Sequence, residues 1–215
     1  ETTLGVTDKM VKICTEAKKI FPLVKTSVNT NGSRLKDLEG IDVLDNIALS
    51  RHHYDDEINN QIFGINTADT DILDSFKDKH KLHLSCNLIK GYVDNEEEIR
   101  KYLEYVSKLG IYDIGLVSLM KINKYCEEHF VDFNKLDLER INNLKRTRWY
   151  CNSLDKMSCS CKCENYLYMA ENYNLLSVYH RQAIKLKGIE EISNYLVLED
   201  KKIMQGFNRA VLNKL

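Results

Sequence analysis

The segment from Lys81 to Asp94, KLHLSCNLIKGYVD, carries hydrogen-bonding side chains at the point where an apolar strand should end. Apolar and polar residues alternate from Leu82 to Cys86, which is the period of a β-strand, and the polar Asn87 follows directly. In open α/β sheets, ligands bind outside the carboxyl ends of parallel strands. The segment therefore predicts a strand that presents polar groups to a bound ligand.

Two upstream segments have the same layout, an apolar strand followed by a cluster of polar side chains. They run from Leu23 to Gly32, LVKTSVNTNG, and from Ile41 to Tyr54, IDVLDNIALSRHHY. The carboxyl ends of parallel strands share one edge of a sheet, so we expect the three polar clusters to lie on one edge. The candidate ligand-binding residues from these clusters are Asn29, Asn31, Ser50, Arg51 and Asn87.

Strands and helices alternate from the start of the chain to about residue 147. The patterns predict strands at 24–29, 43–49, 82–86 and 113–120, helices at 7–20 and 95–109, and helical or partly helical segments at 55–64 and 69–79. The helix at 95–109 has Asn95 as its cap and a buried stripe of Ile99, Leu103, Val106 and Leu109. Each crossover is long enough to be parallel and right-handed, so we expect a curved parallel sheet backed by helices.

After Trp149 the pattern changes to that of an antiparallel hairpin, with strands at 164–171 and 175–183. We therefore divide the chain into a barrel region, 1–148, and a carboxy-terminal extension, 149–215. The basic run from Lys145 to Trp149 is typical of a solvated helix end and does not indicate nucleic acid. An edge strand of the hairpin is able to receive a peptide by strand addition.

The composition fits a globular protein without a strong electrostatic preference for a partner. The chain has 215 residues, 43% of them hydrophobic, and a formal net charge of -1. That balance gives no general attraction to nucleic acid or to an anionic membrane. No apolar run is long enough to span a bilayer, and the first residues, ETTLGVTDKM, lack the layout of a secretion signal. We expect a cytoplasmic protein.

Four of the seven cysteines, Cys151, Cys159, Cys161 and Cys163, fall within thirteen positions. Thiolates are ligands for iron–sulfur clusters and zinc, and cysteine clusters in a reducing compartment bind metal more often than they form disulfides. The Cys-x-Cys-x-Cys spacing is nevertheless not that of a zinc knuckle or a ferredoxin. Two interpretations stay open, namely an auxiliary iron–sulfur cluster or zinc site, and a set of free thiols.

The run from Arg51 to Glu57, RHHYDDE, raises a second metal hypothesis, because imidazoles and carboxylates are good ligands. Adjacent residues of an extended chain point in opposite directions, which disfavours one ion shared by His52 and His53. The favoured interpretation is that one imidazole faces a ligand cavity, while residues 55–57 begin the next helix at its positive end.

Taken together, four motifs resemble those of the radical S-adenosylmethionine superfamily. They are the strand-end turn Thr30-Asn31-Gly32, the pair Ser50-Arg51, the stretch from Asn87 to Asp94 that contains Lys90 and Gly91, and the strand from Ile114 to Leu119. The resemblance covers about residues 7 to 130. It implies an α/β fold, a partial TIM-type parallel (β/α) barrel truncated at the amino end, with a small carboxy-terminal β-hairpin extension.

The resemblance also implies an activity and its cofactors. Members of the superfamily bind S-adenosylmethionine beside a four-iron four-sulfur cluster and generate a 5'-deoxyadenosyl radical. The implied cofactor-binding residues are Asn29, Asn31, Ser50, Arg51, Asn87, Lys90 and Gly91. Arg51 is the strongest candidate for the cofactor's carboxylate. The implied partners are a small-molecule or peptide substrate and a reductant such as flavodoxin or ferredoxin.

The signature of that superfamily, Cys-x-x-x-Cys-x-x-Cys, is absent from this sequence. We therefore expect the chain to be the later portion of a longer enzyme, with the cluster ligands outside it and no activity as a fragment alone. The alternative is a degenerate, non-catalytic barrel whose cysteine-rich hairpin binds a metal or a protein partner.

Overall fold

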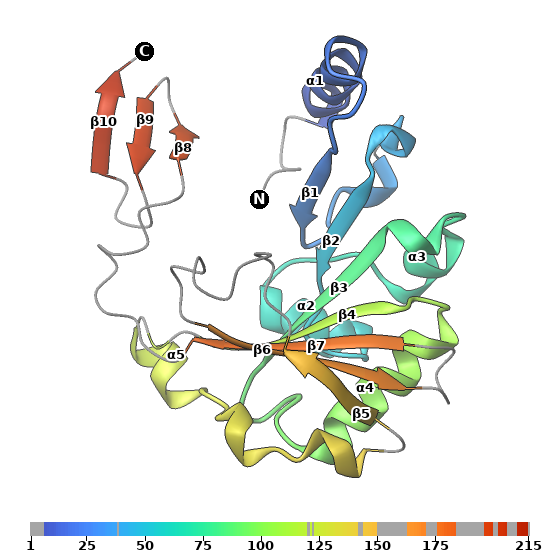
Figure 1. Ribbon diagram of the computed structural model, residues 1–215, viewed down its shortest axis with the longest axis vertical. Helices are drawn as coiled ribbons and strands as arrows, with labels where there is room; N and C mark the ends of the chain where they lie inside the picture. The colour runs from blue at the N-terminus through green and yellow to red at the C-terminus, as the bar shows by residue number, and fades with distance from the viewer. Residues whose placement is uncertain are drawn as a thin grey trace.

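The computed structural model describes residues 7–37, 39–119, 121, 123–141, 144–149, 163–170, 176–183, 196–199, 202–205 and 210–214. Strands β1 to β4 lie next to one another in chain order and run parallel (Figure 1). Their bounds are Ser27–Thr30, Asn46–Ser50, Leu82–Leu88 and Asp113–Ser118. The α/β class and the parallel sheet expected from the sequence are confirmed.

Helices α1 to α5 span Thr7–Ile20, Asp56–Phe63, Thr70–Ser75, Glu96–Lys108 and Lys124–Glu128. Short 3-10 turns occur at Leu35–Asp37, Ile41–Val43, Lys79–Lys81, Phe133–Lys135 and Leu138–Arg140. Helices α2 to α5 begin after a capping side chain that accepts a backbone N–H of the first turn, namely Asp55, Asp69, Asn95 and Asn123. In the described part of the chain, no helix is both long and apolar enough to cross a membrane.

Several elements differ in length from the sequence prediction, and two of these differences have a visible physical reason. The strand expected at 43–49 begins only at Asn46, because Thr26 holds the residues before it through its hydroxyl, which donates to the Val43 carbonyl. The segment predicted to be helical or partly helical at 69–79 is helical only over Thr70–Ser75. There the Phe76 N–H donates to the carbonyl of Leu73, and the Lys79 ammonium donates to the carbonyls of Leu73 and Asp74 at the end of the helix.

One face of the parallel sheet forms the hydrophobic core. Buried side chains on this face include Val28, Ile47, Leu49, Leu84, Cys86, Ile114 and Leu116. They belong to one cluster with the apolar stripe of α4, in which Ile99, Leu103, Val106 and Leu109 are buried as predicted and Tyr102 joins them. Helices α3 and α4 lie on the same side of the sheet (Figure 1). The alternation in the strands therefore reflects a single apolar face.

The opposite face of the sheet, which we call the inner face, carries polar or small side chains. Its residues on β1 to β3 include Asn29, Ala48, Ser50, Ser85 and Asn87, all exposed or half-buried. His83 lies on the same face but is buried, with its Nδ1 3.0 Å from a carboxylate oxygen of Asp113. Parallel sheets are usually apolar on both faces, because helices cover both. The inner face departs from that rule.

The hairpin expected after Trp149 is confirmed, and it belongs to the same sheet. Strands β6, Cys163–Ala170, and β7, Leu176–Ala183, are antiparallel, and β7 pairs with β4 in parallel. The predicted helix end at Lys145 to Trp149 is wrong, because residues Leu144–Trp149 form β5 and pair with β6. Strands β8, Leu196–Glu199, β9, Lys202–Gln205, and β10, Ala210–Lys214, form a second antiparallel sheet. The domain boundary at residue 148 stays a prediction.

The turn after β1 generates a prediction about Gly32. This glycine has φ +80, and a Cβ built on it would lie 2.6 Å from the Cβ of Ala68 and 2.7 Å from a methyl of Leu49. Gly64 has a similar φ of +68, but nothing lies within 4 Å of its added Cβ. Gly64→Ala should lower the free energy of unfolding by about 1 kcal/mol through the left-handed backbone alone.

Gly32→Ala should lower the free energy of unfolding by a further 1 to 3 kcal/mol or so, because the added methyl also overpacks the core. Urea unfolding of both variants measures the difference. Equal losses for the two variants would show that Gly32 is required only for its backbone conformation.

Candidate functional site

The carboxyl ends of β1 to β3 and the loops directly after them form one edge of the sheet, which we call the rim. On the inner face at this edge, Ser50 stands opposite Ser85 in the register between β2 and β3. Asn87 lies on β3 two residues beyond Ser85, on the same face of the sheet. It stands opposite Val117 of β4. Ser50, Ser85 and Asn87 are half-buried. The rim therefore presents two hydroxyls and an amide at neighbouring positions.

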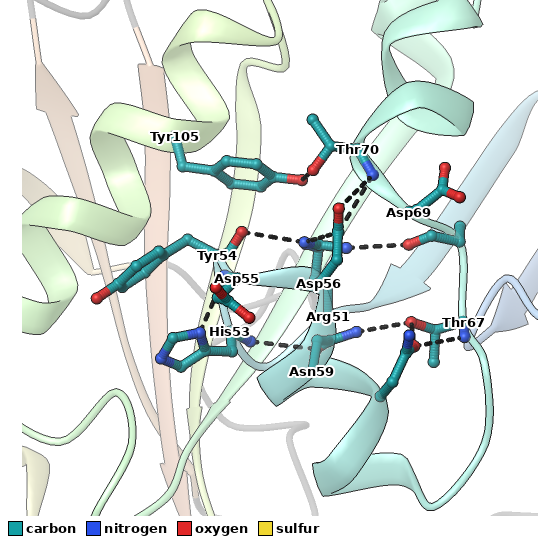
Figure 2. Close-up of polar contacts among 12 residues, drawn as sticks. Arg51, His53, Tyr54, Asp55, Asp56, Asn59, Thr67, Asp69, Thr70 and Tyr105 are labelled. Atoms are coloured by element: carbon teal, nitrogen blue, oxygen red, sulfur yellow. Dashed lines mark hydrogen bonds and ion pairs between the residues drawn. The ribbon is translucent and has the colours of Figure 1, made fainter.

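Arg51, directly after β2, is 1% exposed and is held by several groups of the protein (Figure 2). Its Nη1 donates to the carbonyl of Ala68 at 2.9 Å, and its Nη2 donates to the carbonyl of Tyr54 at 3.1 Å. Nη2 also donates to the Asp56 carboxylate at 2.5 Å. The guanidinium carbon lies 4.9 Å from the centre of the Tyr105 ring.

The charge of Arg51 is balanced by Asp56, the first residue of α2. The same carboxylate accepts the backbone N–H of Thr70, at 3.2 Å to either oxygen, which ties it to the start of α3. Burial disfavours ionisation of Asp56, but the hydrogen bond and the charge of Arg51 outweigh it and lower the pKa of this carboxyl. The ion pair thus joins the loop after β2 to the first turns of two helices.

The Nε of Arg51 is buried and has no hydrogen-bond partner among the residues that the structure describes. Arg51 is the sequence's strongest candidate for a ligand carboxylate, and its Nη groups are engaged by protein acceptors in this structure. A contact between Arg51 and a ligand stays a prediction.

Asn59, on α2, fixes the backbone of the two histidines. Its Oδ1 accepts the N–H groups of His52 at 2.8 Å and His53 at 3.2 Å, and its Nδ2 donates to the Thr67 hydroxyl. Asn59 is fully buried, and the sequence prediction did not single it out. The sequence pattern that could have identified it is its spacing. Asn59 lies on the same helix face as Ile62 and Phe63, where an apolar residue would be expected.

His52 connects the loop after β2 to the end of β3. Its Nδ1 accepts the backbone N–H of Asn87 at 3.1 Å, and its Nε2 lies 3.2 Å from the Asn87 side-chain amide. The ring stacks on Phe63, with 4.7 Å between the ring centres. Burial lowers the pKa of His52 to about 4, so the imidazole is neutral at physiological pH and its Nδ1 stays an acceptor.

The rings of the two histidines have different hydrogen-bond partners. His53 accepts the N–H of Asp55 at its Nδ1 and packs on the Tyr54 ring. Across the described ranges, no group of three or more His, Cys, Asp or Glu side chains is placed to hold a metal ion. Asp55 caps α2 and Asp56 begins it, so the predicted helix start at residues 55–57 is confirmed.

The remaining predicted ligand residues shape turns at the same edge. The Asn31 side-chain oxygen accepts the N–H of Ser33. Gly91 has a φ of +92, and its N–H donates to the Asp94 carboxylate. Lys90 is exposed, and its N–H donates to the carbonyl of His129. The structure therefore brings Ser50, Arg51 and Asn87 together, while Lys90 and Gly91 lie in the turn beyond β3.

The cysteine group lies almost wholly outside the described residues. Cys151, Cys159 and Cys161 are not among them, and Cys163 is placed only as the first residue of β6. A metal site formed by these four cysteines stays a prediction.

Comparisons with known proteins do not assign the chain to a family. No model of a known protein family matches it, and no match was found among curated proteins. The function is therefore inferred from the rim and the inner face alone.

The buried imidazole of His52 generates a prediction about pH. Its pKa is near 4 in the folded protein and near 6.5 in the unfolded chain, so the unfolded state binds the proton first as the pH falls. The stability that this neutral imidazole contributes is complete above pH 6.5 and is lost between pH 6.5 and 4. Over that window the free energy of unfolding should fall by about 1 kcal/mol per pH unit from this group.

Urea unfolding between pH 7.5 and 5 compares the wild type with His52→Gln and with His80→Gln, a variant at an exposed histidine. His52→Gln should make the free energy of unfolding depend less steeply on pH. Part of the dependence should remain, because burial also lowers the pKa of His53. His80→Gln should keep the wild-type slope. A His52→Gln slope equal to that of the wild type would contradict the placement of His52.

Proposed function

We propose that this chain is the later part of a radical S-adenosylmethionine barrel and that its rim binds the adenosyl part of the cofactor. The observation that carries the proposal is the polar inner face of a parallel sheet, with Ser50, Ser85 and Asn87 at the carboxyl edge. Ligands of parallel α/β sheets bind at this edge. A sheet face without the usual apolar cover is suited to line a cavity that holds a polar ligand.

The register indicates how a nucleoside would lie on this face. Ser50 and Ser85 are neighbours and offer two hydroxyls, which suits the paired hydroxyls of a ribose. The next strand continues with Gly115 opposite Ser85 and Val117 opposite Asn87. Gly115 has no side chain and Val117 is apolar, so a flat purine fits against β4 while the ribose faces β2 and β3.

Arg51 serves this site by holding the loop in place. Its Nη groups donate to Ala68, Tyr54 and Asp56, and the Tyr102 hydroxyl donates to the Arg51 carbonyl at 2.9 Å. The Arg51 N–H donates to the carbonyl of Ser85 and thereby extends the pairing of β2 with β3. These contacts fix the position of the adjacent Ser50 relative to Ser85.

The edge of the sheet supports a barrel that continues beyond β1. Among the described strands, β1 is at the end of the seven-stranded sheet. Beside it, α1 and the residues after it expose large apolar side chains, with Ile13 68%, Ile20 67%, Phe21 63% and Leu23 94% exposed. Unpaired strand edges and contiguous apolar surface are features that proteins normally cover. A preceding strand and helix would cover both.

We assign cofactor binding to this chain and the iron–sulfur chemistry of radical formation to residues outside it. A four-iron four-sulfur cluster, when bound, supplies the electron that cleaves a carbon–sulfur bond of S-adenosylmethionine. We place the ligands of that cluster outside this chain, because the sequence lacks the superfamily signature Cys-x-x-x-Cys-x-x-Cys. Cys151, Cys159, Cys161 and Cys163 are proposed to hold an auxiliary cluster or zinc.

Binding of S-adenosylmethionine to the anaerobically reconstituted product of the complete gene tests the proposal, with isothermal titration calorimetry as the measurement. Ser50→Ala and Ser85→Ala should each weaken binding about 3- to 10-fold, because each removes one hydrogen bond to the ribose. Ser107→Ala, on the far side of the sheet in α4, is the matched control and should bind as the wild type does.

Failure of the wild type to bind S-adenosylmethionine would refute the proposal. Equal affinities for Ser50→Ala, Ser85→Ala and Ser107→Ala would refute the assignment of the rim.

A further inference from the structure

A cavity of about 380 Å³ lies at the opposite edge of the sheet from the rim. Its lining includes Asp42, which precedes β2, and Lys81, which directly precedes β3. The lining from α3 and the segment after it consists of Ile72, Ser75, Phe76, Lys77 and Asp78. The volume is within the range of small-molecule sites, roughly 300 to 1,000 Å³. The proposed cofactor site uses none of these residues.

The floor of the cavity is apolar. Leu35 and Ile47 are buried core residues, while Ile41, Ile72 and Phe76 pack on the core and are half-buried. Each of the last three therefore contacts the core on one side and lines the cavity on the other. A ligand with an apolar body would remove this remaining apolar surface from water, which is the main favourable term in such binding.

The charged residues of the lining are mostly basic. Lys36, Lys77 and Lys81 line the cavity together with Asp42 and Asp78, which gives the lining a net charge of +1. Lys81 donates to the backbone carbonyl of Asp42 at 3.0 Å, and the Asp78 carboxylate accepts the N–H of His80.

Two cations of the lining are available to a ligand. The ammonium groups of Lys36 and Lys77 are exposed and have no ion pair or hydrogen bond to another residue in the described part of the chain. An anion placed between them would meet unpaired positive charge above an apolar floor.

We propose that this cavity binds a small monocarboxylate with an apolar body. The carboxylate lies between Lys36 and Lys77, and the apolar body rests on Ile41, Ile72 and Phe76. One negative charge on the ligand balances the net charge of +1 of the lining. The second charge of a dianion would have no unbalanced positive charge to meet, and Asp42 and Asp78 would repel it. The site is separate from the rim, so the inference does not depend on cofactor binding there.

Three isoleucines in the lining make the site directly observable. In a protein labelled at isoleucine δ1 methyls, NMR titration with 3-phenylpropionate should shift the signals of Ile41, Ile47 and Ile72 in a saturable way. The signals of Ile99 and Ile114, in the core between α4 and β4, are the internal reference and should stay in place. Acetate, which lacks the apolar body, and 3-phenylpropanol, which lacks the charge, should shift the three lining signals weakly.

Charge removal provides the second arm of the experiment. The double variant Lys36→Gln/Lys77→Gln should bind 3-phenylpropionate about 5-fold more weakly at low salt. The control Lys12→Gln/Lys135→Gln removes two exposed lysines elsewhere and should bind as the wild type does. The proposal is overturned if the lining methyls do not shift, if 3-phenylpropanol binds as well as the acid, or if the two double variants bind equally.

Discussion

The burial of one guanidinium, that of Arg51, constrains the carboxyl edge of the sheet more than any other described interaction. Removing a charge from water costs roughly several kcal/mol of free energy unless hydrogen-bonding or charged partners surround it. Here two backbone carbonyls, the Asp56 carboxylate and the Tyr105 ring are those partners, and they come from four different segments. The loop after β2, the start of α2, the start of α3 and the face of α4 must therefore meet at one point. Ser50 and the backbone of the two histidines take their positions from that meeting point.

The two faces of the parallel sheet have different roles. One face is buried against α4. The apolar strand residues on this face, such as Val28 of β1 and Leu116 of β4, belong to a single apolar cluster. The inner face carries hydroxyls and amides in register across three strands, with Ser50 beside Ser85 as its centre. Polar residues at these positions contribute nothing to the core, and hydrophobic residues would make a more stable sheet if helices covered them. This departure from an apolar face is the basis of the proposal that the rim binds S-adenosylmethionine.

Local signals in the sequence predicted much of this fold, and tertiary contacts decided the rest. The cap at Asn95, the helix start at residues 55–57 and the alternation in β3 were readable because each depends on residues a few positions apart. The sequence also placed Ser50, Arg51 and Asn87 at one edge. It did not reveal that Arg51 is buried, because its partner carbonyl at Ala68 is distant in the chain and has no sequence signal. The parallel pairing of β7 with β4 was missed for the same reason, since a hairpin strand carries no mark of its second neighbour.

A double-mutant cycle between Arg51 and Asp56 tests most directly whether this buried guanidinium organises the rim. Urea unfolding would be measured for the wild type, Arg51→Met, Asp56→Ala and the double variant. Asp56→Ala should lower the free energy of unfolding by about 3 kcal/mol or more, because it leaves a buried charge uncompensated. The double variant should lose at least about 1 kcal/mol less than the sum of the two single losses, since residues in direct contact are coupled. Losses that add to within about 0.5 kcal/mol would contradict the central place given to Arg51.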